Sequence, residues 1–95
     1  MNQIELTARI AEVSPLRYTP AGVPATNLVL DHESEQQEAG SPRQVRLSIK
    51  AVTFGPLAEQ AGRLDLSQAF RFRGFLASAR TNKSVVFHIQ EFNSL

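Results

Sequence analysis

Apolar residues recur at every second position in several separate segments of this chain. The alternation is clear in residues 4–10, 45–50, 69–73 and 85–89, and a less regular version occupies residues 25–30. A period of two is that of a β-strand with one buried face, because successive side chains of a strand point to opposite sides. The chain is therefore predicted to be mainly β.

Three stretches interrupt the alternation. Pro15 and the turn-forming residues 19–24 separate the first two predicted strands. Residues 31–42 are polar and acidic and end in Gly40 and Pro42, so they are predicted to form a long loop of functional or mobile character. Residues 81–84 are predicted to form the last hairpin loop.

Two local signals predict irregular features between strands. Pro56 is well placed to open a short helix that ends at Gly62. Gly74 is predicted to mark a bulge that turns Phe75 inward, beside Phe70 and Phe72.

Five strands, with one short helix between the third and the fourth, form the layout of an OB-fold, a small Greek-key barrel. SH3-like barrels also have five strands, and the position of the helix favours the OB-fold. We expect one all-β domain over residues 1–95. The predicted core consists of Ile4, Leu6, Ile10, Leu28, Leu30, Val45, Leu47, Ile49, Phe70, Phe72, Phe87 and Ile89.

The composition excludes several classes of protein. The chain has no cysteine, so it has neither a disulfide framework nor a thiolate metal site. No apolar run approaches the ~20 residues that cross a bilayer, and residues 1–5 do not resemble a signal peptide. We expect a cytoplasmic protein.

Residues suited to catalysis are scarce. His32 and His88 are far apart in the sequence, and His88 is expected to point outward. Residues 31–33, Asp-His-Glu, do not converge on one point, and no spacing typical of zinc or phosphate sites is present. The chain is predicted not to be an enzyme and to bind neither a metal nor a cofactor.

Charge is unevenly distributed along the chain. Residues 43–83 hold eight of the ten Lys and Arg but only two acids, which gives +6, whereas residues 1–42 hold two cations and six acids, which gives −4. Cations gathered on one surface would form a groove for a polyanion. Scattered solvated charges are the alternative explanation.

The predicted fold specifies where the cations should lie. An OB barrel binds oligonucleotides on its second and third strands and on the loops after strands one and four. Arg71 and Arg73 are less certain, because the fourth strand lies partly on the other side. The predicted DNA-binding residues are Arg17, Tyr18, Arg46, Lys50, Arg80 and Lys83.

Aromatic stacking is the weak part of this prediction. Single-strand binders stack bases on exposed aromatic side chains. This chain has no Trp, and its six Phe are mostly interpreted as core residues. Tyr18 is the one aromatic residue expected in solvent, and the Arg46 guanidinium can also stack.

Several segments resemble the bacterial primosomal replication protein N (PriB) family, which belongs to the single-stranded DNA-binding protein group. The resemblance is strongest in residues 14–17, 20–24, 28–34 and 37–40, and weaker in residues 74–76 and 88–90. It implies an OB-fold homodimer that binds single-stranded DNA and the PriA helicase when stalled replication forks restart. Family members often carry an aromatic residue where Arg46 stands and a basic residue where Glu33 stands.

Two functions remain open from the sequence. The first is a single-stranded DNA-binding accessory protein of the replication-restart primosome. The second is a protein-interaction adaptor for a helicase, with weak or vestigial DNA binding.

Overall fold

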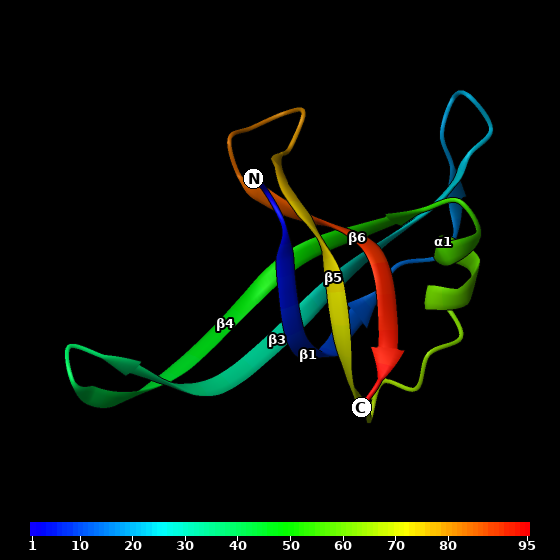
Figure 1. The fold of residues 1–95 in the computed structure, drawn as a ribbon. Helices are drawn as coiled ribbons and strands as arrows, with labels where there is room; N and C mark the ends of the chain where they lie inside the picture. Colours follow the sequence, from blue (N-terminus) through cyan, green and yellow to red (C-terminus); the bar gives the residue numbers. More distant parts are fainter.

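The computed structural model describes residues 1–95, which fold mainly into strands (Figure 1). The single helix, α1, spans Pro56–Ala61 and ends at Gly62, so its predicted position is confirmed. The hairpin loop at 81–84 is also confirmed. The strands are β1 (Ile4–Val13), β2 (Arg17–Tyr18), β3 (Pro24–Glu38), β4 (Ser41–Phe54), β5 (Ala69–Ser78) and β6 (Val85–Ser94).

Five of these strands close into a barrel. Hydrogen-bonded neighbours follow the order β1, β3, β4, β6, β5 and back to β1. Every pair is antiparallel except β4 with β6, where Ala51 lies beside Phe87 and Val52 beside His88. This topology, with α1 between the third and fourth long strands, is the predicted OB-fold. The remaining short strand, β2, pairs with β3. It lies in the segment between the first two predicted strands, where no strand was predicted.

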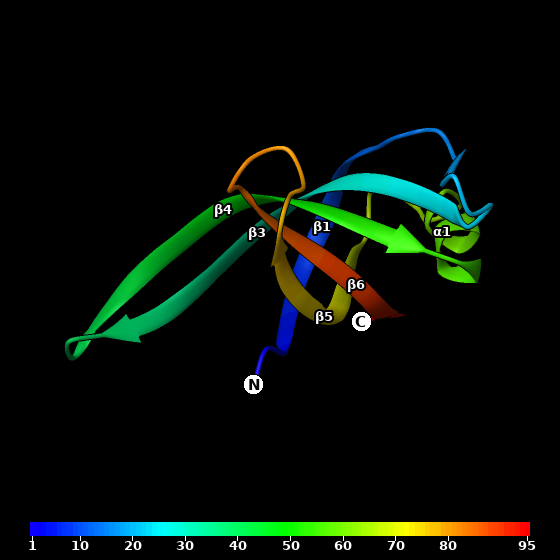
Figure 2. The same cartoon turned by 90° about the horizontal axis from the view of Figure 1, so that it is seen from above.

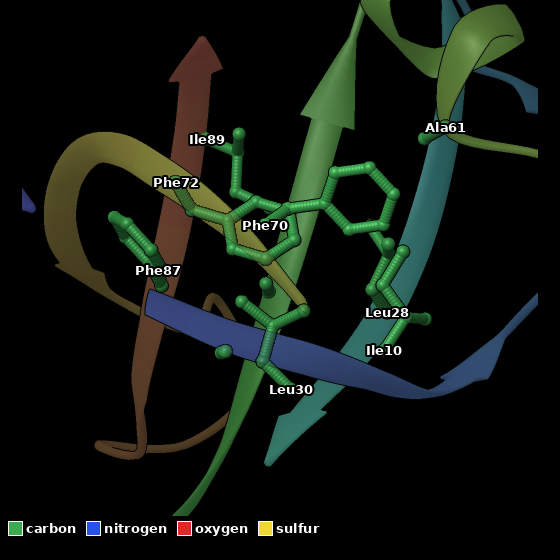
Figure 3. Close-up of a cluster of buried hydrophobic side chains, with 10 residues drawn as sticks. Ile10, Leu28, Leu30, Ala61, Phe70, Phe72, Phe87 and Ile89 are labelled. Carbon is green, nitrogen blue, oxygen red and sulfur yellow. The ribbon is translucent and has the colours of Figure 1, made fainter. Parts of the chain in front are cut away.

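The barrel interior is filled by apolar side chains from all five long strands (Figure 3). Phe72, Phe87 and Leu30 are completely buried. Seven of the predicted core residues are buried and three more are half-buried against them. The buried ones are Ile10, Leu28, Leu30, Phe70, Phe72, Phe87 and Ile89, and the half-buried ones are Ile4, Leu6 and Ile49.

The prediction of a loop at residues 31–42 is wrong. β3 and β4 continue past the barrel as a two-stranded ribbon, residues 31–48, which we call the arm (Figures 1 and 2). Its strands pair without interruption from Asp31 with Ser48 to Glu38 with Ser41. Because the arm projects from the barrel, the molecule measures 49 × 30 × 21 Å.

The arm exists because its turn and its cross-strand pairs suit a hairpin. Ala39 and Gly40 form the turn, with φ of 53° and 80°, and two consecutive positive φ values match the twist of a two-residue hairpin. The alternation predicted at Val45 and Leu47 is correct, but their placement in the core is wrong. Leu47 is 40% exposed and Val45 half-buried, because the arm carries both beyond the barrel.

Gly74 forms the predicted bulge in β5. The register with β6 shifts between Arg73 and Gly74, and a Cβ on Gly74 would lie only 1.9 Å from the carbonyl oxygen of His88. The predicted inward turn of Phe75 is wrong. Gly74 takes the inward position, and the ring of Phe75 lies on the outside against His88.

α1 closes one end of the barrel. The buried hydroxyl of Thr26 donates a 3.0 Å hydrogen bond to the carbonyl of Ala58 in α1, and Ala61 joins the core. This bond fixes the helix to β3 at a depth where an unpaired hydroxyl would be costly. α1 is neither long nor apolar enough to span a bilayer.

The segment after α1 returns the chain to β5 through a small polar turn. The carboxylate of Asp65 accepts hydrogen bonds from the hydroxyl and the backbone N–H of Ser67, at 2.6 and 2.8 Å. These bonds, the hydroxyl first, lower the pKa of Asp65. The guanidinium of Arg9 donates to the carbonyl of Ser67, which joins this turn to β1.

Candidate nucleic-acid interface

One side of β4 faces away from the core, and we call this side, with the matching sides of β3 and β6, the outer face. Opposed residues of an antiparallel pair point to the same side. On β4 the residues of this side are Arg46, Ser48, Lys50, Val52 and Phe54, of which Val52 is buried. The first three are exposed, as predicted for a binding strand.

Arg46 is not a free cation. Glu33 lies opposite it on β3, and the Nη2 of Arg46 is 3.2 Å from the Oε1 of Glu33. On the same side Ser48 donates a 2.5 Å hydrogen bond to Asp31. The positive row expected on β4 is therefore matched by carboxylates on β3 along the arm.

Arg71 and Arg73 are neutralised as well. Glu5 of β1 contacts Arg71 at 3.5 Å and Arg73 at 3.2 Å, and Glu91 of β6 contacts Arg73 at 3.4 Å. Two acids thus balance two cations on the surface of β5. This supports leaving both arginines out of the predicted site.

Lys50, Arg80 and Lys83 take part in no salt bridge. Arg80 and Lys83 are exposed in the loop between β5 and β6. Because β4 and β6 run parallel with Val52 beside His88, this loop, which precedes β6, lies toward the Ser48 end of β4. It is closed by a 2.8 Å hydrogen bond from the N–H of Ala79 to the carbonyl of Ser84.

Arg17 and Tyr18 lie at the other end of the outer face. Arg17 pairs with Ala25 of β3, which in turn pairs with Phe54 of β4. The guanidinium of Arg17 donates a 3.1 Å hydrogen bond to the amide oxygen of Asn27 and makes no salt bridge. Tyr18 is 64% exposed, as expected.

A groove of about 730 Å³ is lined by Lys50 and by none of the other predicted site residues. Its lining includes Lys50 and Asn27, the residue that holds Arg17, and most of the lining is apolar. Lys50 thus lines the groove, Arg17 is hydrogen-bonded to one of its lining residues, and Arg80 and Lys83 lie in the loop before β6, whose Val86 lines it. Arg46 lies farther out, on the arm.

A row of aromatic rings, on and beside the outer face, was not predicted from the sequence. The ring of His88 on β6 stacks on Phe75 of β5, with centroids 4.9 Å apart and planes within 14°, and on Phe54 of β4 at 6.0 Å and 28°. Phe54 is 43% exposed, so its assignment to the core is wrong. The signal was present, since Phe54 has the same parity in β4 as Arg46 and Lys50.

The outer face can thus make two kinds of contact. Unpaired Lys and Arg can bind phosphates, and an exposed aromatic ring can stack on a base. His32, which lies in the arm, points to the other side, where its ring contacts the carbonyl of Thr7 and the hydroxyl of Ser34.

Known proteins are similar to this chain in both sequence and fold. A family profile described as "another single-strand binding protein family" matches residues 2–91. The chain is 47% identical over 92 residues to the replication restart protein PriB of Bordetella pertussis, covering 96% of this chain and 86% of that protein. The chain belongs to the PriB family.

Other PriB proteins extend the likeness. Identity to the PriB of Nitrosomonas europaea is 31% over 95% of this chain and 84% of that protein. The PriB structure of Ralstonia solanacearum superposes with a TM-score of 0.89 at 37% identity, covering 99% of this chain and 97% of that one. A single-stranded DNA binding protein from Thermus aquaticus gives a TM-score of 0.77 at 24% identity, over all of this chain and 50% of that one, which shows a shared fold.

Proposed function

We propose that this chain is a single-stranded DNA-binding accessory protein of the replication-restart primosome and acts in the cytoplasm. The observation that carries the proposal is the set of cations without acidic partners on the outer face of an OB barrel. Lys50 lines the groove, Arg17 is hydrogen-bonded to one of its lining residues, and Arg80 and Lys83 lie in the loop before β6. Membership of the PriB family, whose relatives are replication restart proteins, supports the same role.

The proposed path of the DNA follows this face. The strand crosses from the 79–84 loop over Lys50 to Phe54, Arg17 and Tyr18, and Arg46 lies at its margin with Glu33. Phosphates contact Lys and Arg side chains, and bases stack on Phe54 and Tyr18. Because phosphate contacts carry no sequence information, preference among oligonucleotide sequences should be slight.

Direct binding measurements test the proposal. Fluorescence anisotropy of a labelled oligothymidylate should show binding by the wild-type chain that weakens in Lys50→Ala and Lys83→Ala. Glu59→Ala, on α1 and outside the path, is the control and should bind like wild type. Equal affinity of all four proteins at low salt would place the DNA elsewhere.

A homodimer forms part of this proposal. Residues 4–8 of β1 pair with β5 on one edge only, since pairing with β3 begins at Arg9. The side of the arm opposite the outer face also exposes Leu47. An unpaired strand edge beside exposed apolar surface is what a second copy of the chain would cover.

The acidic side of the arm favours a second candidate function, an adaptor for the PriA helicase. Glu33 pairs with Arg46 and Asp31 accepts a hydrogen bond from Ser48, so the arm presents few available donors to a polyanion. If the adaptor role dominates, binding of purified PriA should survive Lys50→Ala and Lys83→Ala. If DNA binding dominates, oligonucleotide binding and any DNA-dependent association of the two proteins should weaken together in these variants.

A further inference from the structure

The outer side of the arm is acidic, although β4 itself is basic there. The paired positions Asp31 with Ser48, Glu33 with Arg46 and Glu35 with Gln44 all lie on this side. They comprise three carboxylates and one cation, so the formal charge is −2. A polyanion that follows β4 outward from the barrel therefore meets net negative charge.

Each polar group of β4 in this stretch is engaged by β3. Arg46 contacts Glu33 at 3.2 Å, Ser48 donates to Asp31 at 2.5 Å, and Gln44 donates to Glu35 at 3.4 Å. The donors that would bind phosphate already have carboxylate partners.

The pattern changes at the base of the arm. Lys50 lies opposite Val29 and takes part in no salt bridge, although Glu12, the β1 partner of Val29, lines the same groove. The boundary between available and neutralised cations falls between Lys50 and Arg46, only four residues apart on one strand.

The Glu33 and Arg46 side chains are 65% and 78% exposed, so their ion pair is solvated and contributes little to folding stability. Its consequence is electrostatic, because a carboxylate 3.2 Å from the guanidinium opposes the attraction of Arg46 for an approaching phosphate. Replacing Glu33 should therefore leave the fold intact and change only the field at Arg46.

We propose that Glu33 is a specificity-determining residue that neutralises Arg46 and keeps the DNA backbone off the arm, confining single-stranded DNA to the barrel. The inference rests on the proposed function. Among the three cross-strand pairs on this side, Glu33 with Arg46 is the one in which a carboxylate neutralises a cation.

Gain of binding is the test. Glu33→Gln keeps the shape and removes the charge, so Arg46 becomes one more phosphate contact. Each phosphate contact with a single strand adds ~0.7 to the slope of log affinity against log salt. Between about 50 and 200 mM salt, the loss of affinity for labelled oligothymidylate should therefore be roughly three times larger for Glu33→Gln than for wild type. Glu33→Lys should increase it further.

Two matched variants isolate the pair. Glu59→Gln removes the same charge from α1 and should bind DNA like wild type. In an Arg46→Ala background, the gain from Glu33→Gln should vanish. If wild type binds DNA and its salt slope equals that of Glu33→Gln, this inference alone is overturned. If neither protein shows salt-dependent binding, the proposed function is overturned as well.

Discussion

Gly74 approaches His88 so closely that a Cβ on Gly74 would lie 1.9 Å from the carbonyl oxygen of His88. This contact sets the bulge in β5, and the bulge determines which side chains leave the core. Gly74 takes the inward position, so Phe75 lies outside and stacks on His88. The stacking of Phe75 on His88 therefore depends on Gly74, which faces the barrel interior.

Gly74→Ala should destabilise the fold. The methyl group meets backbone atoms, which cannot move aside like the end of a flexible side chain, so we expect a loss of about 1–3 kcal/mol in the free energy of unfolding. Urea denaturation followed by circular dichroism measures it. Gly62→Ala is the control and should be nearly neutral. A Cβ on Gly62 would lie 3.8 Å from its nearest neighbour, and the φ of Gly62, −68°, suits alanine. Equal midpoints for the two variants would contradict the assigned role of Gly74.

Phe54→Ala should weaken DNA binding through the bases. Stacking contributes ~1–3 kcal/mol per base, so affinity for an oligothymidylate should fall roughly five- to 150-fold. An abasic oligonucleotide of equal length, which keeps every phosphate, should bind both proteins equally. An unchanged affinity for the base-containing strand would remove Phe54 from the path.

Phe54→Trp provides an independent readout, because the chain has no other Trp. A base stacked on the indole should quench its fluorescence, and the abasic strand should not. Leu95→Trp, at an exposed position near the C-terminus, should stay bright with both strands. Equal quenching in the two proteins would indicate a non-specific effect.

Leu47→Asp should disrupt the homodimer. Leu47 is an exposed apolar side chain on the side of the arm opposite the outer face, where a charge would be costly to bury against a second copy. Sedimentation should give a dimer for wild type and a monomer for the variant. Leu66→Asp changes a residue of similar exposure in the segment after α1 and should leave the dimer intact. A monomeric wild type at micromolar concentration refutes the dimer.

Local signals in the sequence predicted much of the barrel. Pro56 and Gly62 bound the helix, Gly74 marks the bulge, and the period of two identifies the buried residues of β5 and β6. Each of these features is decided by a few neighbouring residues, which is why a sequence pattern can reveal it.

Features that depend on pairing between distant residues were not predicted. Residues 31–42 are too polar to read as strand, and they form one because each residue of β3 has a partner on β4. The neutralisation of Arg46 follows from that register, since Glu33 is 13 positions away in the sequence. The outward position of Phe75 likewise required the exact shift between β5 and β6.

The salt dependence of oligonucleotide affinity tests the central claim most directly. If the outer face neutralises roughly four phosphates through Arg17, Lys50, Arg80 and Lys83, log affinity should fall with log salt at a slope near −3, from ~0.7 per contact. Lys50→Ala and Lys83→Ala should each reduce the slope by about 0.7, whatever the sequence of the oligonucleotide. A wild-type slope near zero, or slopes that neither substitution changes, would contradict the claim.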